Sequence, residues 1–349
     1  MTSSRVLILG GGLAGLHTAS RLQALGVDWQ LLEARPTLGG RIRTLAHSSA
    51  DLGPAWFWPH QGRMAALIDA LGLGVYPQHA AGDALWEHPG GEIQRQRGTP
   101  PPPSLRIEGG VGALVDALAN PLPEARLHLG TPVSALVRTE ARWRAETSQD
   151  IFEADHLVAA LPPRILAPLL PTAFAALSAS LSAQQTWMAG QAKCVARFAR
   201  PFWRAQGLSG DAFSRRGPMI EIHDASGPDG TDPALFGFLG VPAAARAEAG
   251  IARIREACVQ QLTALFGDEA KAPLALEVQD WAEESFTATQ PDLEEMPAHA
   301  HFDPAPHREV LASNALYLAG SEFARQEPGY LEGALEASSA AVDALLHHL

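Results

Sequence analysis

The stretch "RVLILGGGLAGL", residues 5–16, decides the fold. Its apolar half predicts a buried parallel strand that ends at Gly10, and the leucines that follow at helical spacing predict a helix over 13–25. Between them, Gly10, Gly12 and Gly15 form a Gly-x-Gly-x-x-Gly pattern. Glycines at this spacing let the backbone approach a pyrophosphate, which then lies at the N-terminus of the helix. The alternative interpretation is a glycine-rich turn without a ligand.

The next strand strengthens the nucleotide interpretation. "WQLLEA", residues 29–34, predicts a second strand, and Glu33 stands at the spacing after Gly15 where a carboxylate accepts a hydrogen bond from a ribose hydroxyl. Strand, helix and strand in this order form a βαβ unit. The N-terminal segment therefore predicts an α/β fold with a Rossmann-like, dinucleotide-binding parallel sheet flanked by helices.

The rest of the chain divides into regular and less regular regions. Periodicity predicts helices over 62–71, 111–119, 251–266 and 329–346, and strands over 126–130, 133–138, 142–147 and 156–161. The region 171–305 is less regular, and "TPPPPS" at 99–104 predicts a stiff connector. We expect a smaller α+β substrate-binding domain, interleaved with the nucleotide domain. The predicted segments are 1–62, 109–165 and 306–349 for the nucleotide domain, and 63–108 and 166–305 for the substrate-binding domain.

Composition excludes several classes of protein. The chain has 26 Lys and Arg against 38 Asp and Glu, a net charge of −12 that would repel a nucleic acid. Two cysteines, Cys194 and Cys258, form neither a disulfide framework nor a metal cluster, so a reducing cytoplasm is expected. No apolar run has the ~20 residues of a membrane helix. Because the N-terminus enters a strand at once, we also expect no signal peptide.

Three further motifs resemble one family. "LEARPTLGGRIRT" brings Gly40 and Arg41 close behind Glu33; "ADLGPAWFWPH" starts at residue 50; "LYLAGSEFARQEPGYLEGA" lies near the C-terminus. These motifs resemble the flavin amine oxidase superfamily, strongly at both ends of the chain and loosely between residues 60 and 300. The resemblance implies FAD rather than NAD. It also implies that Arg41 contacts the cofactor phosphate and that the helix beginning near Tyr330 points its N–H groups at the flavin ring.

The resemblance also implies a set of cofactor-binding positions. Val133 matches a backbone contact to the adenine, Gly320 and Glu322 lie by the ribityl chain, and the segment after Gly53 passes the flavin ring. The complete set of expected cofactor contacts is Gly10, Gly12, Leu13, Ala14, Gly15, Glu33, Ala34, Arg35, Gly40, Arg41, Gly53, Ala55, Trp56, Val133, Gly320, Glu322, Gly329, Tyr330 and Leu331. No metal ligand is expected.

Lys193 is unusual in a chain whose basic residues are almost all arginine. The only other lysine is Lys271. "AKCVARFARPFW" is similar to the monoamine oxidase stretch whose lysine holds a water against flavin N5, which implies that Lys193 assists the reaction with O₂. Lysine is a compact ammonium whose pKa changes on burial, whereas guanidinium stays charged. The alternative is a lysine at a strand edge without a function.

The chain departs from the monoamine oxidase pattern at the substrate site. Tyr330 matches one of two aromatic residues that flank the substrate nitrogen in that family, but Gln290 and Pro291 stand where the second is expected. No cysteine occupies the segment that links flavin in some relatives, so FAD is expected to bind non-covalently. Five aromatic residues could supply a wall instead, although each is expected in the core: Trp56, Phe57, Trp58, Trp187 and Phe286.

These motifs predict an FAD-dependent oxidoreductase of amine oxidase type, with Lys193 and Tyr330 as catalytic residues. Hydride would pass from the α-carbon of an amine to the flavin, and O₂ would reoxidise it, giving an imine or aldehyde and H₂O₂. A C–C desaturase, a porphyrinogen-type oxidase and a non-catalytic flavoprotein are the alternatives. "HAHFD" (299–303) resembles a metal site, but its side chains are expected to be solvated.

Overall fold

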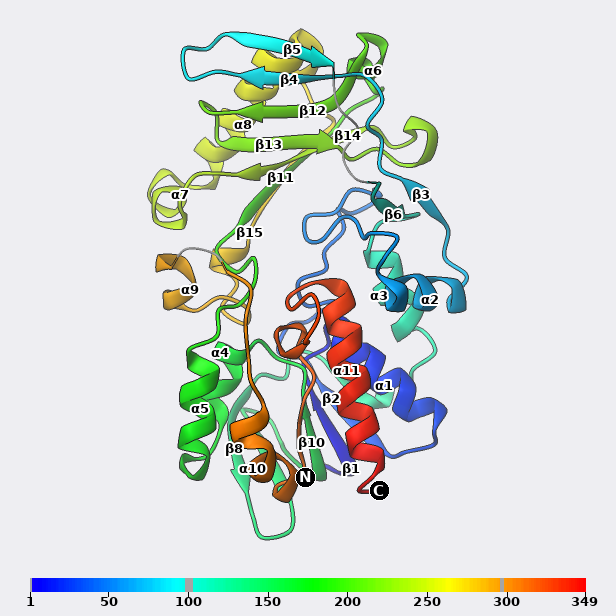
Figure 1. The fold of residues 1–349 in the computed structure, drawn as a ribbon, viewed down its shortest axis with the longest axis vertical. Helices are drawn as coiled ribbons and strands as arrows, with labels where there is room; N and C mark the ends of the chain where they lie inside the picture. The colour runs from blue at the N-terminus through cyan, green and yellow to red at the C-terminus, as the bar shows by residue number, and fades with distance from the viewer. Residues whose placement is uncertain (1, 98–102, 296–297) are drawn as a thin grey trace.

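The computed structural model describes residues 2–97, 103–295 and 298–349, so most of the predicted connector at 99–104 lies outside the described residues. Figure 1 shows two sheets, one above the other along the longest axis of the molecule. The lower sheet has the strand order β7 (Leu127–His128), β2 (Trp29–Leu32), β1 (Thr2–Leu9), β10 (Ile151–Ala159), β9 (Trp143–Thr147) and β8 (Val133–Arg138), and β16 (Leu316–Leu318) also pairs with β10.

The centre of the lower sheet is the βαβ unit predicted from residues 5–34. β1 pairs in parallel with β2 and with β10, and α1 (Leu13–Ala24) connects β1 to β2. Val6 and Ile8 belong to one core cluster, whereas Leu7 and Leu9 belong to the cluster on the other side. The strand is apolar without alternation because both of its faces are buried.

Helices cover both faces of the lower sheet (Figure 1). On one side, the core around Val6 and Ile8 includes residues of α1, α2 (Gly62–Ala70), α3 (Gly112–Ala119) and α11 (Leu331–Leu346). On the other side, the core around Leu7 and Leu9 includes residues of α4 (Pro163–Leu166) and α5 (Ala175–Ser182), with α10 (Arg308–Ser313) packed against it. The sheet is mixed, because β7, β2, β1, β10 and β16 pair in parallel whereas β9 and β8 pair antiparallel. Its position between two layers of helices confirms the predicted α/β fold class.

The upper sheet is largely antiparallel. Its order is β15 (Ala275–Asp280), β11 (Ala192–Arg197), β14 (Ala234–Leu239), β13 (Met219–Asp224), β12 (Leu208–Ser214), β4 (Asp83–Glu87) and β5 (Ile93–Arg97), and only β12 and β4 pair in parallel. The long helix α8 (Ile251–Phe266) packs on one face, where Cys194 and Cys258 are buried. Lys193 and Val195 alternate with Cys194 along β11, so they point to the opposite face.

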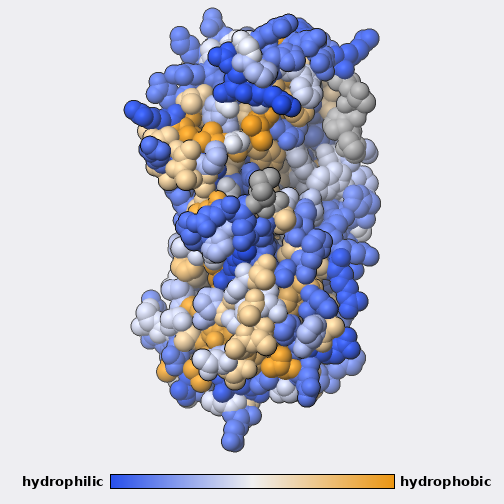
Figure 2. Space-filling view, turned by 60° about the vertical axis from the view of Figure 1, so that its left-hand side comes forward, coloured by the Kyte–Doolittle hydropathy of each residue, from blue (hydrophilic) through white to orange (hydrophobic). Residues whose placement is uncertain are grey.

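The remaining elements are short. β3 (Val75–Pro77) and β6 (Leu105–Ile107) form a two-stranded sheet. α6 (Phe202–Ala205), α7 (Ala243–Ala249) and α9 (Gln290–Glu294) are short helices in the segments between strands. Within the described residues, no helix combines the length and apolar composition that crossing a bilayer requires. Figure 2 shows one face, on which hydrophilic side chains predominate and apolar ones form smaller patches.

Two sequence expectations differ from the structure. The predicted strand at 126–130 is reduced to Leu127–His128, because residues 124–126 form a 3₁₀ turn. The region 171–305, expected to be less regular, supplies β11 to β15 of the upper sheet. Its strands contain glycine and charged residues, as in "LSGDAFS" and "MIEIHD", and pairing with neighbouring strands outweighs these weak local preferences.

Candidate active site

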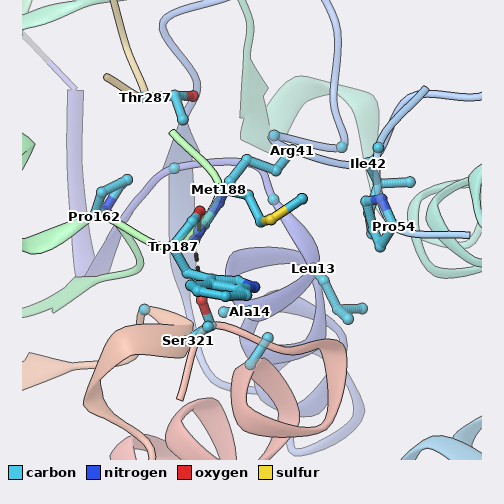
Figure 3. A pocket seen from close by; sticks show the side chains of 18 of the residues that line it. Leu13, Ala14, Arg41, Ile42, Pro54, Pro162, Trp187, Met188, Thr287 and Ser321 are labelled. Carbon is cyan, nitrogen blue, oxygen red and sulfur yellow. Dashed lines mark hydrogen bonds between the residues drawn. The ribbon is translucent and has the colours of Figure 1, made fainter. Parts of the chain in front are cut away.

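A cavity of about 560 Å³ is lined by residues of both sheets. Every residue predicted as a cofactor contact or catalytic group lines it, except Gly15 and Glu322. Residues far apart in the sequence meet here, because the N-termini of α1 and α11 and one face of the upper sheet turn toward the same space. Figure 3 shows part of this lining from close by, including Leu13 and Ala14 of α1 and Ser321.

The glycine turn before α1 fits a closely bound phosphate group. Gly10 has a φ of 97°, a conformation that side chains disfavour. A Cβ on Gly15 would lie 1.9 Å from the carbonyl oxygen of Gly10, so only glycine permits this contact. The N-cap, Gly12, has no side chain to accept from the first turn of α1. The N–H groups of that turn are therefore available to an anionic ligand.

Glu33 is held by the backbone at the end of β2. Its Oε2 accepts from the N–H of Gly11 at 2.6 Å, and its Oε1 accepts from the N–H of Arg35 at 2.9 Å. The residue is only 5% exposed, yet it lines the cavity. Each carboxylate oxygen has a second lone pair, so this fixed orientation leaves acceptors for a ribose hydroxyl.

Arg41 and Glu322 form an ion pair beside the cavity. The guanidinium donates from Nη1 to Oε1 of buried Glu322 at 2.6 Å and from Nη2 to Oε2 at 3.1 Å. It also donates to Ser321 Oγ at 2.9 Å and to the carbonyl oxygen of Trp187 at 3.0 Å, a convergence that Figure 3 shows. Glu322 does not line the cavity itself, but its ion pair orients Arg41, which does.

Aromatic side chains form one wall of the cavity. Trp187 and Tyr330 have ring centroids 6.2 Å apart at an angle of 41°, and Trp58 meets Tyr330 edge-on at 5.9 Å. His299 stacks on Trp187 at 3.7 Å and on Tyr330 at 5.0 Å. The expectation of a solvated His299 is therefore wrong: its half-buried ring supports two rings of the wall. Of the five aromatic residues expected in the core, only Phe57 lies there; the others line the cavity.

The other two polar residues of the "HAHFD" motif do not contribute to this wall. His301 and Asp303 are exposed. Across the described parts of the chain, no group of three or more His, Cys, Asp and Glu side chains could hold a metal ion.

Lys193 reaches the cavity wall from β11. It is 2% exposed, and its Nζ donates to the carbonyl oxygen of Gly53 at 3.0 Å. The ammonium also lies 3.8 Å from the centroid of the Phe236 ring, within the range of a cation–π interaction. Burial lowers the pKa of Lys193 to about 7, although the nearby Asp51 carboxylate opposes this shift. The side chain can therefore change its charge near neutral pH.

Asp51 and Arg106 form a buried charged pair behind Lys193 that sequence analysis missed. Both are 1% exposed, and Nη2 of Arg106 lies 3.9 Å from Oδ2 of Asp51. Burial raises the pKa of Asp51 to about 6, against the opposing influence of Arg106 and of a hydrogen bond from Thr44. The three charged residues come from separate parts of the chain, so no local motif indicates them.

Glu221 is a second residue that sequence analysis missed. It lies on β13, lines the cavity, and accepts a hydrogen bond from Nε2 of His223 at 2.7 Å. Nδ1 of His223 in turn bonds to Asp211 at 2.8 Å. The alternation of "MIEIHD" could have placed Glu221 and His223 on one face of a strand, but not the face that meets the cavity.

The glycine-rich βαβ unit, the largely antiparallel sheet and the cavity between them define an α/β protein of Rossmann-like type, in which a second sheet lines the same cavity. The sequence profile of the flavin containing amine oxidoreductase family matches residues 13–104 and 93–346. The chain belongs to this family, which implies a flavin cofactor.

Relatives match over nearly the whole chain. Flavin-containing amine oxidase B of Cavia porcellus is 23% identical, with 98% of this chain and 86% of that protein covered. A structure of putrescine oxidase bound to putrescine has a TM-score of 0.81 at 18% identity and covers 99% of each chain. A structure named as a protoporphyrinogen oxidase, from Exiguobacterium sp. 255-15, has a TM-score of 0.76 at 18% identity and covers 100% of each.

Proposed function

We propose that this protein is an FAD-dependent amine oxidase. The observation that carries the proposal is the position of Lys193: a buried ammonium in the wall of a cavity that also contains the glycine turn and the aromatic wall. The proposed reaction removes hydride from the α-carbon of a neutral amine. The resulting imine hydrolyses to an aldehyde, and O₂ accepts the electrons and becomes H₂O₂.

The residues present fit a dinucleotide. The uncapped N-terminus of α1 would hold the pyrophosphate, and Glu33 would accept from the ribose. The N-terminus of α11 has no side-chain cap either, and Tyr330 and Leu331 there line the cavity, so its N–H groups would stabilise negative charge on the flavin ring. When bound, FAD supplies the hydride acceptor and the route for electrons to O₂.

We further propose that FAD binds without a covalent link. Cys194 and Cys258 are both buried in the core of the upper sheet, between β11 and α8. Neither lines the cavity. A thioether to the flavin would therefore have no cysteine partner at the site.

The chain's own side chains would bind and orient the amine. Trp187 and Tyr330 would flank the nitrogen, and the apolar surroundings would favour its neutral form, because burial disfavours the ammonium. Lys193 would hold a water or present its charge to reduced oxygen species next to the cavity wall.

We propose the domain division 1–62, 109–165 and 306–349 for FAD binding, and 63–108 and 166–305 for substrate binding. The distribution of strands supports it. All strands of the lower sheet fall in the first set of segments, and all strands of the upper sheet fall in the second.

The test is anaerobic mixing of the purified protein with a panel of primary and secondary amines, followed through the visible absorbance of the flavin. We expect bleaching by at least one amine, and recovery of colour with release of H₂O₂ when O₂ is admitted. A flavoprotein that no amine bleaches would overturn the proposal. Bleaching by a porphyrinogen or by a substrate that gains a C=C bond would instead support the oxidase or desaturase alternative, for which the shared fold of the protoporphyrinogen oxidase is the supporting observation.

A further inference from the structure

We infer that Glu221 selects amines that carry a second cationic group, so that the preferred substrates are diamines or related dications. This inference rests on the proposed amine oxidation and adds a substrate class to it. It assigns Glu221 a specificity role on the cavity wall, two strands away from Lys193. The carboxylate would bind the cationic group that is not oxidised.

The register of the upper sheet places Glu221 at a defined distance from Lys193. Lys193 on β11 lies opposite Phe238 on β14, and Phe238 lies opposite Glu221 on β13. Residues directly opposite each other share a face of the sheet. Two strand spacings separate Lys193 from Glu221, or about 10 Å. All three residues line the cavity, so the row sets a fixed spacing between Lys193 and Glu221 along the cavity wall.

The wall between the two ends of this row suits an alkyl chain. Phe238 stands in the row itself, and Trp56 packs edge-on against it with the ring centroids 6.5 Å apart. Trp56 also meets the ring of His223 at 5.2 Å, which fixes the indole next to the carboxylate end. A flexible methylene spacer could lie along these rings while its two nitrogens reach opposite ends.

Glu221 offers a negative charge that is not already satisfied. Its side chain lines the cavity and is 42% exposed, and only Oε1 accepts from His223; among the described residues no donor reaches Oε2. The hydrogen bond from His223 lowers the pKa of Glu221. Burial alone would lower the pKa of His223, but its bonds to Asp211 and Glu221 raise it overall. Two carboxylates around one histidine leave a net negative charge whether or not the imidazole is protonated.

The other carboxylate in the described cavity lining is not available in the same way. Glu33 receives hydrogen bonds on both oxygens from the backbone of Gly11 and Arg35, and it lies at the position for a ribose. Glu221 is therefore the acidic side chain that a second cation could reach from the amine site.

The experiment compares matched pairs of substrates in the holoprotein and in Glu221→Gln. Butylamine and 1,4-diaminobutane form one pair, and hexylamine and 1,6-diaminohexane form another. We expect the diamine of at least one pair to reduce the flavin about 10- to 100-fold more efficiently than its monoamine, the range for a charge-assisted hydrogen bond. In Glu221→Gln this ratio should fall toward one. Thermal melting checks that the variant folds.

Binding supplies a readout that does not depend on turnover. 2,5-Diamino-2,5-dimethylhexane has no C–H bond next to either nitrogen, so it can bind without being oxidised. Calorimetry should show that the wild type binds it at least about tenfold more tightly than a tertiary-alkyl monoamine, and that Glu221→Gln does not. Glu256→Gln removes the same charge from the exposed side of α8, and it should leave both ratios unchanged.

The outcomes separate the two proposals. If monoamines and diamines reduce the flavin equally well, the protein is an amine oxidase and the role of Glu221 is wrong. A diamine preference that survives in Glu221→Gln, or that Glu256→Gln also abolishes, overturns the assignment to this residue. If neither kind of amine reduces the flavin, the proposed function itself fails.

Discussion

A lysine ammonium in the wall of an apolar cavity loses hydration, and Lys193 recovers only part of it. Its partners are the carbonyl oxygen of Gly53, the face of Phe236 and the charge of Asp51. Desolvation outweighs the favourable charge, so the pKa of Lys193 falls to about 7. An arginine at this position would stay charged, which explains in physical terms why a lysine occurs in a chain that otherwise uses arginine.

The first prediction concerns the charge of Lys193. Lys193→Met should fold and bind FAD but react with O₂ about 10²–10³ times more slowly, the usual cost of removing one electrostatic contact to a developing charge. In the wild type the rate should fall as pH rises through about 7, because Lys193 loses its proton there. The variant should lack this pH dependence. Stopped-flow reoxidation measures both effects, and a mutant rate within a few-fold of wild type would contradict the role.

The second prediction concerns Asp51. Its charge favours the protonated form of Lys193, so Asp51→Asn should lower the pKa of Lys193 below about 7. The pH profile of reoxidation should therefore shift toward acid. The melting temperature should also fall, since Arg106 would lose a buried counter-charge. Asp116→Asn, on the exposed side of α3, is the control. An unshifted profile in Asp51→Asn would show that the pair is not coupled to Lys193.

At the scale of elements, local patterns predicted the parts of the site that local sequence builds. β1, the glycine turn, α1 and β2 follow one another directly, and strand and helix periodicity with Gly10, Gly12 and Glu33 was sufficient to place them. The row from Lys193 to Glu221 depends instead on the register of three strands, and β11 and β14 pair although β12 and β13 lie between them in the sequence. Pairing of this kind is not encoded in any one stretch, which is why Glu221 could not be predicted.

The third prediction concerns the contact between the glycine turn and α1. Gly15→Ala should place a methyl group 1.9 Å from the carbonyl oxygen of Gly10 in the present structure, and backbone must move to relieve it. Overpacking of this kind costs about 1–3 kcal/mol or more, and the shifted turn should lose most of its affinity for FAD. Flavin content and thermal melting measure the effects.

Gly62→Ala at the start of α2 is the matched control for Gly15→Ala. A Cβ there meets nothing within 4 Å, so stability should change by no more than about 1 kcal/mol. If Gly15→Ala binds FAD as tightly as Gly62→Ala does, the close approach at the turn is not needed for the cofactor.

At the scale of the whole molecule, the cavity exists only because the two sheets meet. The glycine turn and Glu33 come from the lower sheet, whereas Lys193 and Glu221 come from the upper one. The sequence indicated both groups of segments, but it did not indicate that β4, with β5 as its other neighbour, would pair with β12 across more than a third of the chain. Aromatic residues expected in the core line the cavity for the same reason: the interface between the sheets is itself hollow.

The last prediction follows from the proposed position of the cofactor between the sheets. A ligand that binds only the folded state stabilises it, by about 2.7 kcal/mol at a hundredfold excess over Kd, so added FAD should raise the melting temperature of the whole chain in one transition. Because Cys194 and Cys258 lie in the core of the upper sheet and not at the cavity, the flavin should leave intact when acid precipitates the protein. Chromatography of the supernatant should recover unmodified FAD. Flavin that remains with the precipitated chain would contradict non-covalent binding, and a melting temperature indifferent to FAD would show that added FAD does not bind the folded chain.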